Sequence, residues 1–192
     1  PQATYKRHEQ GWIDEVYKDL DKLLDRAITA RKNKEAVSIA YDGNIVDLWE
    51  RVVERNIHIE IGSDQTSLHN PWSGGYYPVG MSYETANEMI TNNPEEFKKE
   101  VQKTLVRHTN AINTLSKRGM YFFDYGNAFL LEASRAGADI LKPNDGSVVI
   151  YPVFTSAAYK EPGFYTYFRG ECDESCITDL SFENPEFKYT SS

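Results

Sequence analysis

The spacing of apolar residues between positions 36 and 61 constrains the fold more than any other feature, because it changes twice. Residues 36–41 form a short, β-branched apolar run of strand length, which Asp42-Gly43-Asn44 ends. Residues 45–53 carry apolar side chains at helical spacing, and residues 57–61 have strand character again. A strand, a short helix and a strand in close succession are typical of a βαβ unit. The sequence therefore predicts a parallel sheet covered by helices, an α/β fold.

Regular patterns continue on both sides of this unit as far as residue 140. Residues 13–28 have the spacing of an amphipathic helix. A long helix is predicted to begin at Asn93-Pro94, with Glu96 completing a capping box, and to end at Gly119. A further strand and helix are predicted at residues 120–123 and 128–136.

Residues 141–192 differ in character from the α/β body predicted for residues 1–140. They are irregular and β-leaning, and from residue 162 onward aromatic residues are interleaved with acidic ones. We expect this divergent segment or insertion to be ordered and packed on the body or on a partner chain, because so many exposed rings would be adhesive. Cys172 and Cys176 lack the further Cys or His ligands of a zinc site, so no bound metal is expected.

The charge balance limits the possible partners. With 29 acidic and 21 basic residues the net charge is −8, which argues against binding to a nucleic-acid backbone. A nucleotide ligand remains possible, because backbone N–H groups at a helix N-terminus can hold a pyrophosphate. No apolar run approaches the ~20 residues that span a bilayer, so no membrane partner is expected. Only two cysteines are present, which is typical of a cytoplasmic protein.

Polar residues gather at three positions where a predicted strand ends: residues 42–44, 62–69 and 124–127. Because ligands bind at the carboxyl ends of parallel strands, three such loops at one edge favour a binding site over ordinary turn chemistry. His69 is interpreted as a hydrogen-bonding residue and His58 and His108 as structural residues. Asp124 has two open interpretations, which are orientation of Tyr125 and capping of the helix that follows.

Several segments together resemble the urocanase family. Residues 64–71, DQTSLHNP, are followed by Gly74-Gly75-Tyr76-Tyr77-Pro78. This is similar to the family's Asp-Gln-Thr-Ser, His, acid or amide, and Pro, followed by Gly-Tyr-x-Pro. Gly43-Asn44 lies where the family has Gly-Asn-Ala, and residues 123–127 match its Phe-Asp-Tyr-Gly-Asn. Gly11-Trp12-Ile13-Asp14 resembles its Gly-Tyr-x-Asp. The likeness covers about residues 5–140.

The resemblance implies a Rossmann-like NAD-binding domain within a cytoplasmic, homodimeric lyase. The family adds water to urocanate to give 4-imidazolone-5-propanoate in histidine degradation, and its tightly bound NAD+ acts as an electrophile. No catalytic residue can be assigned. The cofactor contacts that the resemblance implies are Asn44, Ile45, Gln65, Thr66, Ser67, Leu68, His69, Tyr76, Tyr77 and Tyr125.

The sequence also departs from the family pattern. It holds neither the glycine-rich phosphate loop that the family carries upstream nor its downstream Phe-Arg-Trp-x-Cys segment beside the substrate. Ile45 replaces an alanine, and one extra glycine precedes Tyr76. We therefore expect the isolated chain to be inactive. The alternatives are a Rossmann-like domain of another NAD-dependent oxidoreductase and a non-catalytic domain for nucleotide binding or assembly.

Overall fold

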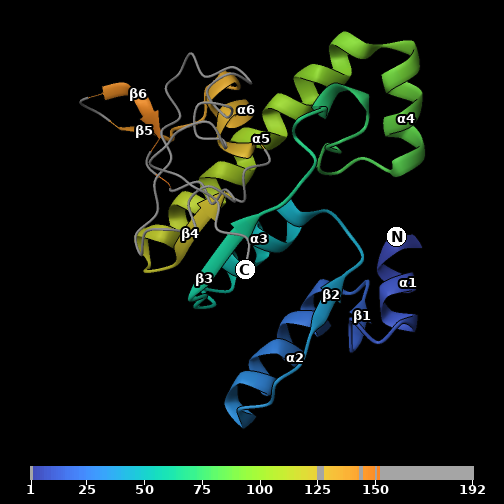
Figure 1. Cartoon of the computed structure of the whole chain (residues 1–192), viewed down its shortest axis with the longest axis vertical. Helices are drawn as coiled ribbons and strands as arrows, with labels where there is room; N and C mark the ends of the chain where they lie inside the picture. The colour runs from blue at the N-terminus through green and yellow to red at the C-terminus, as the bar shows by residue number, and fades with distance from the viewer. Residues whose placement is uncertain (1, 125–127, 143–144, 150, 152–192) are drawn as a thin grey trace, which may run out of the picture. The chain divides into compact units, whose positions relative to one another are not determined.

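The computed structural model describes residues 2–124, 128–142, 145–149 and 151 (Figure 1). The chain divides into two compact units, Pro1–Ile57 and His58–Ser192. Tyr125, both cysteines and nearly all of the predicted C-terminal segment lie outside the described residues. The domain boundary at residue 140 and the packing of the tail therefore stay predictions.

The first unit is a βαβ unit with a helix at each end. Its elements are α1 (Gln2–Glu9), β1 (Glu15–Tyr17), α2 (Leu20–Asn33), β2 (Ile39–Tyr41) and α3 (Ile45–Glu54). β1 and β2 run parallel, with Val16 opposite Ala40, and α2 connects them. The buried apolar residues of this unit come from the two longer helices, and they are Leu23, Leu24, Ala30, Val46, Trp49 and Val52.

β1 was not predicted, because its apolar residues also fit the spacing of the helix that follows. Residues 13–28 were expected to be helical throughout, but α2 begins only at Leu20. The side chain of Asp19 accepts a hydrogen bond from the backbone N–H of Lys22 and so caps the helix at this point. Upstream of this cap, the backbone of residues 15–17 pairs with β2 instead.

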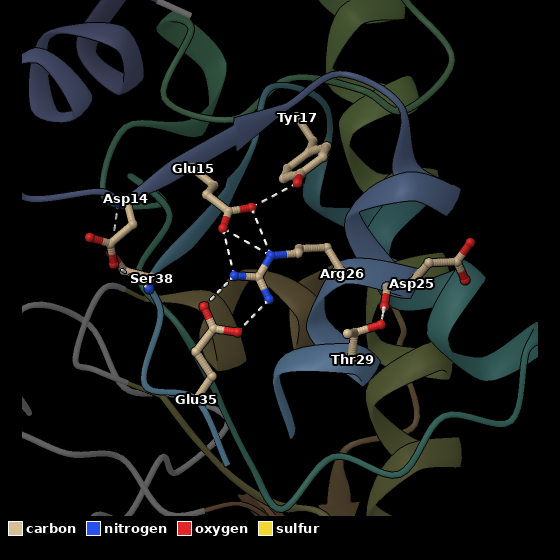
Figure 2. A network of polar contacts seen from close by, with 8 residues as sticks. All are labelled: Asp14, Glu15, Tyr17, Asp25, Arg26, Thr29, Glu35 and Ser38. Carbon is tan, nitrogen blue, oxygen red and sulfur yellow. Dashed lines mark hydrogen bonds and ion pairs between the residues drawn. The ribbon is translucent and has the colours of Figure 1, made fainter. Parts of the chain in front are cut away.

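A network of charged side chains connects α2 with β1 (Figure 2). Arg26 donates to Glu15 from Nε at 2.9 Å and to Glu35 from Nη2 at 2.6 Å. Tyr17 donates its hydroxyl to Glu15 at 2.7 Å. The hydrogen bonds from Arg26 lower the pKa of both glutamates. Arg26 therefore holds the crossover helix to the strand before it and to the segment after it.

The second unit contains another parallel strand pair joined by helices. In chain order it consists of β3 (Ile61–Asp64), the 3-10 helix η1 (Pro71–Ser73), α4 (Tyr83–Asn92), α5 (Pro94–Lys117), β4 (Tyr121–Asp124), α6 (Phe129–Arg135), β5 (Leu141–Lys142) and β6 (Asp145–Val149). β3 and β4 are parallel and in register from Ile61 opposite Tyr121 to Asp64 opposite Asp124. β5 and β6 are antiparallel. α5 supplies more buried residues than any other described element, including Phe97, Val101, Leu105, Ile112 and Leu115.

Strand pairing differs from the prediction. The strands predicted at residues 36–41 and 57–61 were expected to pair with each other, but β2 pairs with β1 and β3 pairs with β4. β3 also begins at Ile61, so His58 precedes the strand. Apolar spacing identifies strands without indicating which ones pair. The α/β class with parallel strands is confirmed.

The helices of the second unit follow the prediction more closely, with two differences. α4 was missed and begins after Ser82, whose hydroxyl accepts from the backbone N–H of Thr85. The predicted capping box of α5 is wrong, since Asn93, within the described residues, makes no side-chain capping bond. The backbone of Asn93 belongs to both neighbouring helices. Its N–H donates to the carbonyl of Met89 in α4, and its carbonyl accepts from the N–H of Phe97 in α5. Among the described helices, none has the length and apolar character needed to cross a membrane.

We expect Arg26→Met to lower the melting temperature of the chain by a few degrees at neutral pH. Carboxylates whose pKa is lowered by folding stabilise the folded state above the ordinary glutamate value of about 4.3. That contribution disappears as the pH falls through the lowered values. The difference between variant and wild type should therefore shrink on acidification. Thermal unfolding followed by circular dichroism across this range tests it.

Lys32→Met is the matched control, because Lys32 is an exposed cation on the same helix. It should melt like the wild type at each pH. A deficit in Arg26→Met that is equally large at neutral and acidic pH would mean that the ion pairs are not its cause.

Candidate functional site

A buried aspartate begins the polar loop that follows β3. Asp64 is 3% exposed, and its Oδ1 accepts hydrogen bonds from Thr66, from the backbone N–H at 3.0 Å and from the hydroxyl at 2.7 Å. We refer to residues 65–75 as the β3 loop. Its first residues leave the sheet in a turn that the aspartate stabilises. The loop exposes the polar side chains of Gln65, Ser67 and His69.

The β3 loop folds back on itself at Gly75. The backbone N–H of Gly75 donates to the carbonyl of Asn70 at 3.2 Å. A Cβ at this position would lie 2.2 Å from the carbonyl oxygen of Ser67 and 2.5 Å from that of Asn70. Gly74 has a φ of +86°, in the left-handed region that favours glycine. Gly74 is therefore favoured for its left-handed backbone, and Gly75 because there is no room for a side chain.

A buried polar cluster lies beneath the loop. The hydroxyl of Tyr76 and Nδ1 of His108 are hydrogen-bonded at 3.1 Å, and Nε2 of His108 lies 4.0 Å from Oδ2 of Asp64. His108 is fully buried, and the ring of Phe129 packs against its imidazole with the two ring centroids 4.7 Å apart. Burial, and secondly the charge of Asp64, raise the pKa of the Tyr76 phenol, so its hydroxyl stays protonated.

The end of β4 carries a second buried aspartate beside the first. Asp124 lies opposite Asp64 in the register of the two strands and is fully buried. Its Oδ2 accepts a hydrogen bond at 3.0 Å from the backbone N–H of Leu130, in the first turn of α6. The helix-capping interpretation of Asp124 is therefore confirmed. Its orientation of Tyr125 stays a prediction, because Tyr125 is not described.

The remaining predicted contact residues occupy varied environments. Leu68 is 1% exposed, so its side chain belongs to the core. Tyr77 is half-buried and donates its hydroxyl to Asn87 at 3.2 Å. Asn44 caps α3, accepting from the backbone N–H of Val46 at 2.9 Å, and Ile45 is the first residue of that helix.

The expected meeting of three strand ends is only partly observed. The ends of β3 and β4 are neighbours in one sheet, whereas β2 belongs to the sheet of the first unit. The sequence interpretation of His108 as structural agrees with its burial but missed its contacts with Asp64 and Tyr76. The available clue was its spacing, since positions 101, 105, 108 and 112 lie on one face of α5.

Comparisons with known proteins agree on one family. The sequence profile of the family described as Urocanase Rossmann-like domain matches residues 1–164. The probable urocanate hydratase of Dictyostelium discoideum is 57% identical over 156 residues, which cover 80% of this chain and 23% of that protein. The urocanate hydratase of Homo sapiens is 50% identical over 149 residues, which cover 75% of this chain and 22% of that protein. The chain thus spans less than a quarter of the length of these relatives.

We expect Gly75→Ala to lower the free energy of unfolding by roughly 3 kcal/mol, since the new methyl group would overlap two carbonyl groups and force a backbone shift. Gly80→Ala is the matched control. Gly80 has a φ of +76°, and nothing lies within 4 Å of the place that a methyl group would take, so only backbone strain of about 1 kcal/mol applies. Urea unfolding of both variants measures the difference. Equal losses would show that close packing at Gly75 is unimportant.

Proposed function

Because the chain belongs to the urocanase family, we propose that it supplies part of the NAD+-binding site of a urocanate hydratase. The reaction adds water to urocanate and gives 4-imidazolone-5-propanoate in histidine degradation. The observation that carries the proposal is the β3 loop, whose exposed Gln65, Ser67 and His69 follow a buried anchor at Asp64. The same residues carry the family's motif. A cytoplasmic homodimer is also proposed, on the resemblance alone.

The chemistry of the β3 loop fits the polar parts of a dinucleotide. An amide, a hydroxyl and an imidazole together offer donors and acceptors for ribose hydroxyls and a carboxamide. The half-buried ring of Tyr77 can flank a nicotinamide or an adenine. Bound NAD+ would supply an electrophile, and the residues of this chain would bind and orient it. Asn44 and Ile45 are proposed contacts on the same grounds of motif position.

Three of the proposed contact residues have side chains that are engaged within the protein, namely Thr66, Leu68 and Tyr76. The hydroxyl of Thr66 donates to Asp64, and the side chains of Leu68 and Tyr76 are buried. Their side chains therefore shape the loop, and direct cofactor contacts from them would come from backbone groups. Tyr125 remains a proposed contact that rests on the family motif.

We predict that the 192-residue chain alone does not hydrate urocanate. It lacks the phosphate loop and the substrate segment of the family pattern, and catalysis needs all reacting groups held in one near-attack geometry. The ultraviolet absorbance of urocanate should stay constant when the purified chain is mixed with NAD+ and urocanate. A fall in absorbance catalysed by the chain alone would contradict this.

In the full-length protein that contains this chain, Gln65→Ala and His69→Ala should each weaken NAD+ binding roughly 5- to 10-fold. That is the range expected when one hydrogen bond to a ligand is lost. NAD+ content after gel filtration and the rate of urocanate loss are the measurements. Ser73→Ala is the control, because Ser73 is exposed on the same loop outside the motif.

Variants at Gln65 and His69 that both retain wild-type cofactor content would contradict the assignment of the β3 loop. Accumulation of reduced NADH with a hydroxy-acid or alcohol substrate would instead indicate an oxidoreductase.

A further inference from the structure

We propose that His108 is a positioning residue that holds the two ends of the β3 loop in their cofactor-binding geometry. The inference rests on the proposed function of this loop. His108 belongs to α5, yet its ring reaches both Asp64, immediately before the loop, and Tyr76, immediately after it. It lies outside the family motif segments, which are residues 11–14, 43–44, 64–71, 74–78 and 123–127.

The contacts through the cluster are hydrogen bonds except for the one between Asp64 and His108, whose 4.0 Å separation is too long for a hydrogen bond. One carboxylate oxygen of Asp64, Oδ1, holds Thr66 at the start of the loop. The other oxygen, Oδ2, faces Nε2 of His108. Nδ1 on the opposite side of the imidazole bonds the hydroxyl of Tyr76. The imidazole thus connects the loop's first turn with the residue that follows its last glycine.

Burial limits the arrangements open to these three side chains. The exposed fractions of Asp64, Tyr76 and His108 are 3%, 3% and 0%. The Tyr76 and His108 rings are nearly parallel, with an interplanar angle of 17° and centroids 6.3 Å apart, and Phe129 packs on the imidazole from α6. A buried polar group that loses its partner is costly, because water cannot replace the lost hydrogen bond. The cluster therefore has one strongly favoured arrangement, and the loop shares it.

A histidine that merely fills the core would behave differently from one that positions the loop. A filler can be replaced by an apolar side chain of similar volume with little effect on a ligand at the surface. A positioning residue needs a polar atom at the place of Nδ1, because Tyr76 must be held by its hydroxyl. Asparagine can place its amide there, whereas leucine cannot.

The test compares His108→Asn, His108→Leu and Tyr76→Phe in the full-length protein. We expect Tyr76→Phe and His108→Leu to weaken NAD+ binding about 5- to 10-fold, as loss of one hydrogen bond would. His108→Asn should stay within about twofold of the wild type, since the hydrogen bond to Tyr76 is retained. Affinity is measured by NAD+ titration well below the melting temperature, and thermal stability is measured alongside.

The decisive result is a divergence between affinity and stability. His108→Leu should bind NAD+ more weakly than His108→Asn even when it melts at the same or a higher temperature. The double variant Tyr76→Phe/His108→Leu should bind no more weakly than His108→Leu alone, because the hydrogen bond that Tyr76→Phe removes is already lost in His108→Leu. Asn110→Ala, at an exposed position on α5, should match the wild type.

Tyr76→Phe keeps the inference testable if the His108 variants do not fold, because it removes only one hydroxyl group. Wild-type affinity in Tyr76→Phe, with binding still weakened by His69→Ala, would overturn the role of His108 and leave the loop assignment intact. Affinities that follow melting temperature across all variants would also overturn it. A wild-type protein that binds no NAD+ would overturn both proposals.

Discussion

The carboxylate of Asp64 is buried at the point where β3 ends, and the organisation of the second unit depends on satisfying it. A buried carboxylate is tolerated only when it is hydrogen-bonded or paired. Thr66 satisfies one of its oxygens from the loop, and the imidazole of His108 approaches the other from α5. The strand, the loop and the long helix are thereby brought to one place. The loop can expose polar side chains because the residue that holds its first turn, Asp64, is buried.

The neighbouring strand solves a similar problem differently. Asp124 is as buried as Asp64, but its hydrogen bond goes to the backbone at the start of α6. One carboxylate is thus directed to a loop and the other to a helix. In the first unit, by contrast, charged groups remain partly exposed, and Arg26 connects two glutamates near the surface. Screening by water makes such pairs weaker than buried ones. They help to hold α2 against β1, but an exposed carboxylate, unlike the buried Asp64, does not need a protein partner.

A candidate site could be predicted from the sequence because its residues are contiguous. Positions 64–69 combine a carboxylate, an amide, hydroxyls and an imidazole at a strand end, and a local pattern of that kind is visible without a structure. The helix α6 could also be predicted from a local pattern, and its predicted limits differ from the observed ones by one residue at each end. β1 could not be distinguished from the start of α2, because three apolar residues before a helix fit either period. The predicted strand pairing was wrong for a related reason, because the partner of a strand can lie far away in the sequence and local spacing does not identify it.

The sequence by itself determined the α/β class, the order of most helices and strands, and the family to which the motif segments belong. These properties depend on local spacing and on short runs of residues. Only the tertiary structure decided that β2 pairs with β1 and β3 with β4. It also decided that residues 64, 76 and 108 meet, although they are far apart in the chain. Such contacts depend on which helix packs beneath which loop, and the spacing of residues along one segment carries no information about the segment that will cover it.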